Sequence, residues 1–224
     1  MEEVNSVPAR SYRQFCGLAR SLDVVGDRWS LLIVRELLVG PMRYVELATA
    51  LGGIATNLLA DRLRGMERAG VVERRVGDAG VVYALTPWGE QLREPVEALV
   101  RWGRPLMFTG PGGDAFQPRW LAVALPALLT GRTAQPAVEV GIEVPGMSFT
   151  LRLDETGPHV TVDPEQRAAT VLAAEPEVVL GLAAGALALD QALAVAEVHG
   201  DRRLLATVFA ATDELPRAEQ SVMT

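Results

Sequence analysis

The chain has 224 residues, of which 49% are hydrophobic and 22% charged, and its formal net charge is −7. This composition excludes wholesale disorder, and the length favours two modest domains. The longest apolar run, residues 178–189, has 12 residues, whereas about 20 are needed to span a bilayer. The first ten residues contain no apolar signal core, so we expect a cytoplasmic protein that does not enter a membrane.

Residues for catalysis and metal binding are scarce. One cysteine and two histidines, His159 and His199, exclude an internal disulfide framework and leave little for a metal site. Ser-His-Asp arrangements, metal-ligand clusters, phosphate-binding glycine loops and nucleotide fingerprints are all missing from the sequence. We therefore expect no enzyme activity, no cofactor and no bound metal.

Charge is divided unevenly along the chain. Residues 1–110 contain 14 Arg against 13 Asp and Glu, a net charge of +1, whereas residues 111–224 contain 7 Arg against 15 acidic residues, a net charge of −8. Nucleic-acid binding depends on a local basic patch rather than on the total. Any contact with DNA is therefore expected in the first half.

The first half contains helical periodicity followed by two strands. Helices are predicted over residues 14–25, from about Trp29 to Gly40-Pro41, around residues 44–51 and from about Thr56 to Ala69. Residues 71–76 and 81–85 are typical of strands joined by a Gly-Asp-Ala-Gly turn. Thr86 and Pro87 are suited to the N-cap and first position of a helix that we expect to run to about residue 106. Short helices followed by a hairpin predict a winged helix-turn-helix over residues 1–108.

The second half has a different pattern. Residues 109–118 form a predicted linker around Gly110-Pro111-Gly112-Gly113. Within a domain expected over 119–214, a helix at 119–130 precedes alternating strands at 138–144, 147–154 and 159–163, which predict an antiparallel sheet with one solvated face. A further strand near 168–174 and helices near 175–185, 187–196 and 201–211 follow, and residues 215–224 form a tail. The fold class is thus mainly α with a small β content, in which a winged helix precedes an α+β domain.

Residues 12–107 resemble the HxlR-type winged-helix transcriptional regulators. The resemblance rests on Cys16, Gly26-Asp27-Arg28-Trp29, Gly40-Pro41 with Arg43, Ile54, Leu58, Arg62-Leu63, Gly70, and Tyr83-Ala84-Leu85-Thr86 with Gly89. One departure is Tyr44, where the family usually has Phe. The resemblance implies a homodimer that binds double-stranded DNA at a pseudo-palindromic operator, and we expect it to act as a repressor.

Residues 119–212 resemble the sterol-carrier-protein fold through the alternating strands, the Ala-rich helices and the closing Val198-His199-Gly200-Asp201-Arg202. This resemblance implies an apolar tunnel and an apolar small-molecule effector. Residues expected to line it are Phe149, Leu151, Val160, Val178, Val179, Leu182 and Phe209. The same residues could instead fill an ordinary core.

The helix predicted at 56–69 is the candidate reading helix. Its outer stripe, opposite the apolar face, consists of Asn57, Asp61, Arg64 and Arg68. Asn can pair with adenine and Arg with guanine, while Thr56 and Asn57 lie where exposed N–H groups favour a phosphate. Arg68 could instead complement the helix dipole. Asp61 repels phosphate, so it either accepts a hydrogen bond from a cytosine amino group or orients an arginine.

Other arginines are candidates for the DNA backbone. Arg43 precedes the third helix, and Arg74 and Arg75 flank the wing, so we expect all three to contact phosphates. Arg62 points toward the apolar side, where it either reads DNA or pairs with a carboxylate of the protein.

One such domain covers little of the duplex, so we expect a dimer, and the resemblance to the HxlR-type regulators implies that its interface lies on the first helix and the long helix after residue 87. Its candidate residues are Leu18, Leu22, Leu92, Val96, Leu99 and Val100, for which packing within one domain is the alternative. The resemblance implies that Cys16 is an oxidant or electrophile sensor, which nearby positive charge would activate. The alternative is a small buried apolar residue.

Two functions from different classes follow from these patterns. The first is a ligand-responsive, homodimeric DNA-binding regulator. The alternative is a lipid-binding or protein-interaction module in which the winged helix serves only dimerisation. Replacement of the candidate arginines would abolish DNA binding in the first case and leave ligand or partner binding unchanged in the second.

Overall fold

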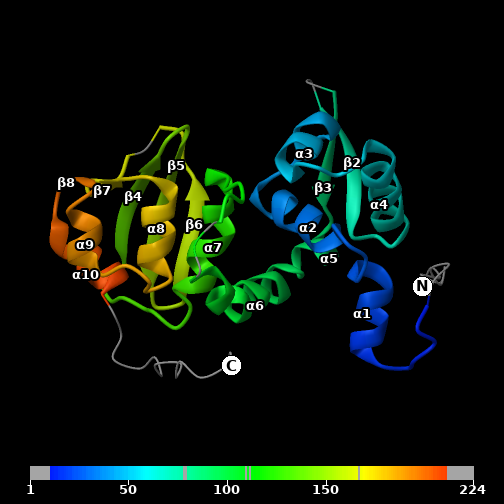
Figure 1. Ribbon diagram of the computed structural model, residues 1–224, viewed down its shortest axis with the longest axis horizontal. Coiled ribbons are helices and arrows are strands. Elements are labelled where there is room, and N and C mark those ends of the chain that lie inside the picture. Colours follow the sequence, from blue (N-terminus) through cyan, green and yellow to red (C-terminus); the bar gives the residue numbers. More distant parts are fainter. Residues whose placement is uncertain (1–10, 78–79, 109, 111, 166, 211–224) are drawn as a thin grey trace. The chain divides into compact units, whose positions relative to one another are not determined.

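The computed structural model of the protein describes residues 11–77, 80–108, 110, 112–165 and 167–210. The chain divides into two units, Met1–Leu128 and Leu129–Thr224. Each unit contains its own helices and sheet (Figure 1). No helix among the described residues is both long and apolar enough to cross a membrane.

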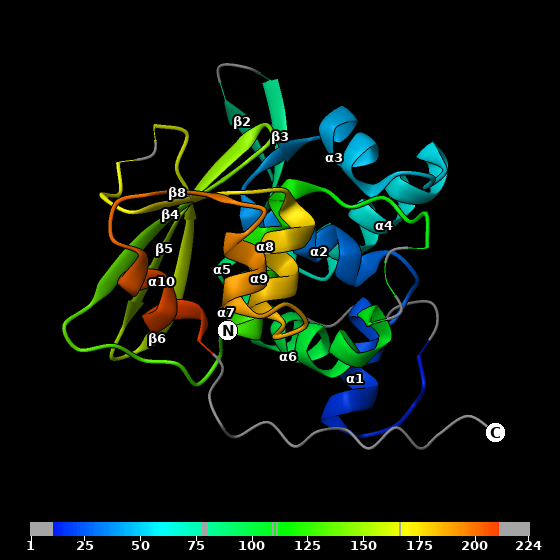
Figure 2. The same cartoon turned by 60° about the vertical axis from the view of Figure 1, so that its left-hand side comes forward.

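The first unit begins with four helices and a small sheet in the predicted order. The elements are α1 (Gly17–Val25), α2 (Ser30–Val39), β1 (Met42–Arg43), α3 (Tyr44–Leu51), α4 (Thr56–Arg68), β2 (Val72–Gly77) and β3 (Gly80–Leu85). The antiparallel sheet has the order β1-β3-β2, and the β2–β3 hairpin projects beyond the helices as a wing (Figure 2). The winged helix-turn-helix prediction is confirmed, and only the two-residue β1 was missed because it is too short to show alternation.

The core of the first unit is formed by the inward faces of α2, α3 and α4. Ile33, Leu47 and Leu59 are fully buried, and Leu63 is almost so. Leu59 and Leu63 lie four residues apart on one face of α4, so burying them against α2 and α3 fixes which face of α4 is left outward. A wide apolar stripe on each helix therefore sets the orientation of the predicted reading helix.

The helix predicted over residues 87–106 is divided in the structure. It consists of α5 (Pro87–Glu90), α6 (Arg93–Gly103) and a 3₁₀ turn, η1 (Arg104–Met107). Pro95 has no N–H to donate to the carbonyl of Gln91, which accounts for the interruption between α5 and α6. The predicted cap is confirmed, because the Thr86 hydroxyl accepts a hydrogen bond from the N–H of Gly89 at 3.0 Å.

The first unit continues past the glycine-rich segment. The 3₁₀ turn η2 (Pro118–Trp120) and α7 (Leu121–Leu128) belong to it, although we expected residues from 119 onward to open the second domain. The division between the units therefore falls after Leu128 and not within residues 109–118.

A buried carboxylate accounts for this difference. The Glu36 side chain on α2 is fully buried. One of its carboxylate oxygens, Oε1, accepts hydrogen bonds from Trp120 Nε1 at 2.7 Å and Arg35 Nη2 at 2.7 Å. The Nε of Arg119 lies 3.1 Å from Oε2 without the alignment of a hydrogen bond, and its Nη2 donates to the Glu36 carbonyl at 3.0 Å. The Arg35 guanidinium also stacks on the Trp120 ring at 3.9 Å, so η2 is bound to α2 by charge, hydrogen bonds and stacking.

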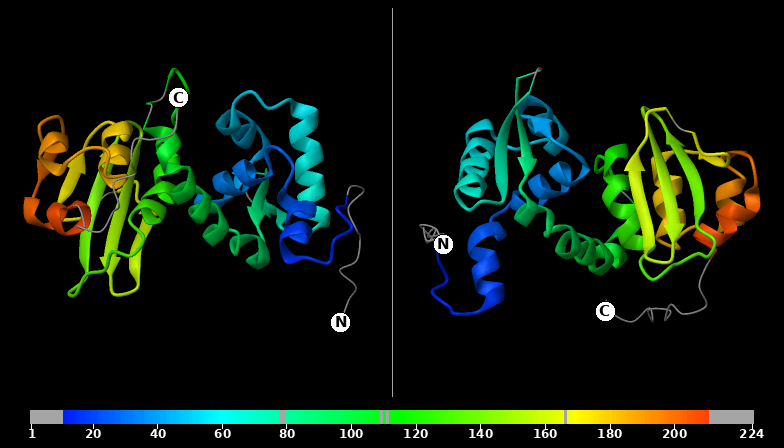
Figure 3. Two further views of the ribbon diagram at one scale, coloured as in Figure 1. Left: turned by 60° about the horizontal axis from the view of Figure 1, so that its bottom comes forward. Right: turned by 180° about the vertical axis from the view of Figure 1, so that it is seen from behind.

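The second unit is an α+β layer. Its strands are β4 (Val138–Val144), β5 (Met147–Asp154), β6 (Gly157–Val162), β7 (Val171–Ala173) and β8 (Glu197–His199), and its helices are α8 (Pro176–Ala183), α9 (Leu189–Leu193) and α10 (Arg202–Phe209). The sheet has the order β6-β5-β4-β7-β8. Helices α8 and α10 lie on one face, and Figure 3 (right) shows the strands from the other face.

Two details of the sheet differ from the prediction. The sheet is mixed rather than antiparallel, because β7 pairs in parallel with β4. The strand β8 was not predicted, since three residues are too few to show alternation. The three alternating strands were predicted correctly, with Phe149, Leu151 and Leu153 of β5 buried and Arg152 exposed.

Candidate DNA-binding surface

The outer face of α4 carries the predicted reading residues. Asn57, Asp61, Arg64 and Arg68 are all exposed, on the side opposite the buried Leu59. An exposed stripe of this length on the second helix of a helix-turn-helix is the part that can enter a major groove. Arg68 makes no ion pair with any residue that the structure describes, while its place in the last turn also suits the helix dipole.

The N-terminus of α4 has no cap from its N-cap side chain, although the Leu58 N–H of its first turn donates to Asn57 Oδ1 at 2.9 Å. Its N-cap residue is Ala55, which has no side-chain oxygen to accept the N–H groups of the first turn. Thr56 and Asn57 follow it and are exposed. The hydroxyl of Tyr44, on α3, donates a hydrogen bond to the carbonyl of Thr56 at 2.6 Å. The two helices of the helix-turn-helix are thus tied together at the point where α4 begins.

The wing arginines point to opposite sides of the sheet. Arg75 of β2 and Arg43 of β1 are both paired with Val82 of β3, and directly paired residues share a face. Arg74 lies on the other face, where its Nε is 2.6 Å from Glu67 of α4. The structure therefore brings Arg74 next to the reading helix. It places Arg75 beside a shallow depression of about 370 Å³ between the end of α2 and the start of α5.

Four of the five predicted DNA-contacting arginines pair with carboxylates. The pairs are Arg43–Glu46, Arg64–Asp61, Arg74–Glu67 and Arg75–Glu73. The hydrogen bond between the two side chains lowers the pKa of Glu46 and raises the pKa of Arg43. Of the two roles expected for Asp61, the pairing with an arginine is present, and the i,i+3 spacing of Arg43–Glu46 could have predicted that pair as well. The cross-element pair with Glu67 had no sequence signal.

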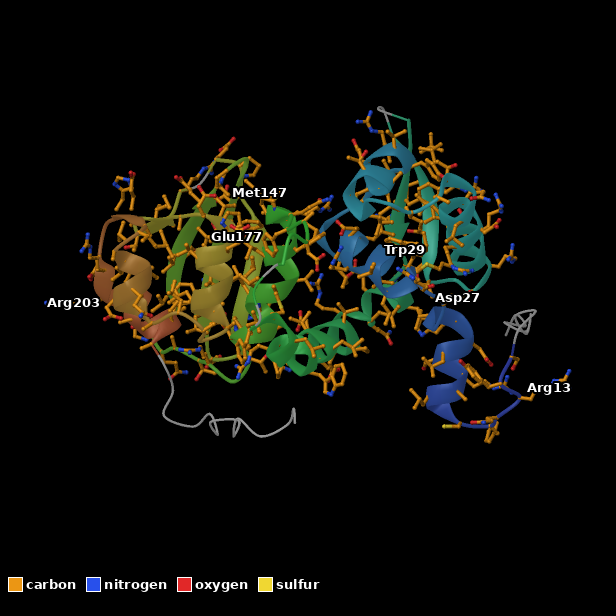
Figure 4. All side chains as sticks on the ribbon, in the orientation of Figure 1. Arg13, Asp27, Trp29, Met147, Glu177 and Arg203 are labelled. Atoms are coloured by element: carbon orange, nitrogen blue, oxygen red, sulfur yellow. The ribbon has the colours of Figure 1, made fainter. Side chains whose placement is uncertain are left out.

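The turn between α1 and α2 is bound to α4 by an ion pair, and Figure 4 labels Asp27 and Trp29 of this turn. Arg62 of α4 forms an ion pair with Asp27 at 2.7 Å, so of the two roles considered for Arg62 the carboxylate pair is present. Trp29, which begins α2, has a left-handed backbone with φ of 82°. A bulky residue adopts this conformation only when its surroundings enforce it, and the Trp29 side chain packs on the core.

The predicted dimer residues fall into two groups. Leu18, Leu22 and Leu99 are exposed. Val96 is only 6% exposed and belongs to the core of its own unit, and Leu92 packs against that core, so packing within the unit is the correct interpretation for both. Val100 is half-buried. Neighbouring apolar residues that the sequence analysis missed are also exposed, namely Tyr12, Phe15, Trp102, Leu106, Met107 and Phe108.

Cys16 is exposed at the N-cap of α1, so its interpretation as a small buried residue is wrong. Hydrogen bonds from the backbone N–H groups of Ala19 and Leu18 lower the pKa of its thiol. The cause is the open N-terminus of a helix rather than the arginines nearby in sequence. Within the described ranges, no group of three or more His, Cys, Asp or Glu side chains could hold a metal ion.

The predicted ligand-lining residues form the core of the second unit. Phe149, Leu151, Val179, Leu182 and Phe209 are at most 4% exposed, while Val160 and Val178 are half-buried. A depression of about 260 Å³ in this unit lies elsewhere, around Gln135, Arg152 and Asp154. The structure thus places these seven residues in or at the edge of a packed core.

Comparison with known proteins identifies relatives of the first unit. A sequence profile described as "HxlR-like helix-turn-helix" matches residues 24–109. The HTH-type transcriptional regulator YtfH of Escherichia coli is 35% identical over 94 residues, which cover 41% of this chain and 75% of YtfH. The HTH-type transcriptional regulator YodB of Bacillus subtilis is 32% identical over 95 residues, which cover 41% of this chain and 83% of YodB. The crystal structure of quinone-bound YodB covers 39% of this chain and 96% of its own, with 31% identity and a TM-score of 0.36.

Proposed function

The chain belongs to the HxlR-like helix-turn-helix family of transcriptional regulators, and on this premise we propose that it is a homodimeric repressor that binds a pseudo-palindromic operator. Membership of the family makes it a DNA-binding regulator, and its relatives are regulators, as expected for a chain that is not an enzyme. The observation that carries the proposal is the exposed outer stripe of α4 beside an uncapped helix N-terminus.

In the proposed complex α4 enters the major groove. Asn57 would pair with an adenine and Arg64 with a guanine, each through two hydrogen bonds. The backbone N–H groups of Thr56 and Asn57 would bind a phosphate and fix the register of the protein on the DNA. Arg43, Arg74, Arg75 and Arg68 would contact the backbone on either side. A dimer seated on a promoter then represses by excluding the polymerase.

Exposed apolar side chains support the dimer. Phe15 and Leu18 beside or within α1, and Trp102, Leu106 and Phe108 at the end of α6 and in η1, are between 55% and 103% exposed. Both segments lie on the lower side of the first unit in Figure 1, away from the wing tip. Large exposed apolar residues in this number are costly in water and typical of an interface. A second copy is the occupant that the family and a two-fold symmetric operator require.

Two inputs would control this dimer. The second unit would bind an apolar small-molecule effector at the margin of its core, where Val160 and Val178 are half-buried. Such a ligand must favour one dimer geometry over another, for which a coupling of about 1–3 kcal/mol suffices. Cys16 would supply a second input, since an exposed thiolate at a helix N-terminus can add to an electrophile such as a quinone.

DNA binding by arginine variants tests the proposal. Arg43, Arg64, Arg74 and Arg75 are replaced together by Ala, and binding to the sequence that the wild type selects from a random pool is measured by fluorescence anisotropy. We expect binding to that sequence to be lost while the dimer mass by analytical ultracentrifugation is unchanged. If the wild type selects no sequence, but a fluorescent fatty acid binds the wild type and the variant equally, the lipid-binding alternative replaces the proposal.

A further inference from the structure

The candidate DNA-binding surface is close to electrically neutral although it is rich in arginine. Its five arginines, Arg43, Arg64, Arg68, Arg74 and Arg75, face four carboxylates in the pairs given above, so its formal charge is only +1. The four pairs come from β1, α3, α4 and β2, and two of them, Arg43–Glu46 and Arg74–Glu67, join different elements. These carboxylates therefore oppose the proposed ligand, DNA, which is itself an anion.

The pairs are exchangeable rather than structural. The Arg74 and Arg75 side chains are 61% and 53% exposed, and those of Glu73 and Glu67 are 44% and 19% exposed. In both pairs at least one partner is exposed, and ion pairs at a protein surface contribute little to folding because water screens the charges. Their removal would scarcely change the fold, and their effect must be sought in binding.

The contacts leave part of each guanidinium available. Glu67 faces Nε of Arg74. Glu73 accepts a hydrogen bond from Nε of Arg75 and lies 2.7 Å from its Nη2, which donates to the carbonyl of Leu85. A guanidinium has five N–H donors in a fixed plane. One carboxylate therefore orients the group and still leaves an outer edge that can bind a phosphate, so a closely docked complex keeps the pair intact.

We propose that the carboxylates paired with these arginines determine specificity by suppressing binding to random DNA. Non-specific binding arises from neutralisation of phosphates and depends on the charge that the surface presents. Each carboxylate removes one unit of that charge. In the docked operator complex the oriented guanidinium binds its phosphate well, which offsets the lost charge. A loosely held random sequence does not benefit from the orientation of the guanidinium. The inference rests on the proposed function.

Glu67 and Glu73 are the sites for the test. Glu46 also accepts the N–H of Arg43 at the start of α3, at 2.8 Å, and Asp61 lies on the reading stripe, so changes there would alter more than charge. Glu67→Gln and Glu73→Gln keep the side-chain shape and remove one charge each. The matched control is Glu94→Gln, an exposed carboxylate in the same unit but on α6, which lies away from the wing tip (Figure 1).

Affinities for the selected operator and for random DNA are measured by fluorescence anisotropy at a fixed salt concentration, after matched thermal melts show that all variants fold alike. We expect each single variant to bind random DNA about two- to fivefold more tightly, and the double variant about tenfold. The operator affinity should change less than twofold, so the specificity ratio falls.

Three results would overturn the inference. The first is a double variant that binds random DNA with the affinity of the wild type. The second is a double variant whose affinity rises equally for operator and random DNA. The third is an equal rise in affinity for random DNA in Glu94→Gln, which would make the effect one of total charge. Equal affinities of the wild type for operator and random DNA would refute the proposed function itself. This result needs only the wild-type affinities, so it can be told apart from a failure of the inference.

Discussion

Replacement of Arg119 tests whether the η2 segment is an integral part of the DNA-binding unit. In Arg119→Met the buried Glu36 carboxylate loses the guanidinium that lies 3.1 Å from Oε2, and its carbonyl loses a hydrogen bond of 3.0 Å. The remaining partners of the carboxylate are Arg35 and Trp120. The change therefore leaves a buried charge partly compensated.

The size of the effect follows from the burial of the pair. Removing one partner of a fully buried ion pair costs about 3–5 kcal/mol. The Arg119 side chain is 18% exposed, and the Glu36 side chain keeps the Arg35 pair, so we expect a loss of about 2–3 kcal/mol in the free energy of unfolding. By contrast, Arg64→Met breaks an exposed pair with Asp61 and should cost less than about 1 kcal/mol.

The chain itself supplies a selective probe. All four tryptophans, at positions 29, 88, 102 and 120, lie in the first unit. Urea unfolding followed by tryptophan fluorescence therefore reports the first unit alone, which avoids treating two units as one transition. A double variant, Glu36→Met with Arg119→Met, should cost less than the sum of the two single losses because the two side chains contact each other. It still loses stability relative to the wild type, because Arg35 is left without its carboxylate.

An Arg119→Met effect as small as that of Arg64→Met would refute this reasoning. So would a Glu36→Met, Arg119→Met double variant that simply adds the two single losses, because the coupling between the two side chains would then be absent.

Three further outcomes are expected. The pKa of the Cys16 thiol lies below its ordinary value, so alkylation of Cys16 by iodoacetamide should reach half its maximal rate at a lower pH than alkylation of N-acetylcysteine. An equal or higher pH midpoint would contradict the helix N-terminus as the cause of a lowered pKa. Tyr44→Phe removes the hydroxyl that donates a hydrogen bond to the first residue of α4 and should weaken operator binding about fivefold. In the control variant Tyr83→Phe, the removed hydroxyl has no hydrogen-bond partner among the described residues, so operator binding should stay unchanged. Hydrogen bonds from the Thr156 side chain and backbone hold the pKa of Asp154 well below 3.8, so the ionised group stabilises the fold above pH 4 and this contribution is lost as pH falls further. The difference in stability between the wild type and Asp154→Asn, followed by far-UV circular dichroism, should therefore shrink below pH 4. A difference that stays constant with pH would contradict this assignment.

Periodicity predicted the features of the fold that depend on local sequence. The order of α1 to α4, the wing and the strands of the second unit follow from 3.6- and 2-residue patterns that decide which face of each element is buried. The exposed stripe of α4 was predictable for the same reason, because Leu59 and Leu63 fix the inward face. These parts of the site needed no knowledge of distant contacts.

Features that depend on contacts between distant residues were not predictable. The boundary at Leu128 depends on Glu36 and Arg119, which are 83 residues apart in sequence. The parallel pairing of β7 with β4 likewise depends on tertiary structure. The glycine-rich segment near residue 110 resembled a domain boundary because glycine and proline break regular structure, but such residues indicate a turn and not where a unit ends.

Sequence-specific binding by the wild-type chain is the measurement that bears most directly on the proposed function. Fluorescence anisotropy with the DNA upstream of its own gene, repeated over a salt series and against random competitor, separates base contacts from phosphate contacts. We expect tight binding that resists the competitor, with affinity falling as salt rises. Weak binding that random DNA removes at every salt concentration, with and without added effector candidates, would contradict recognition of an operator by α4.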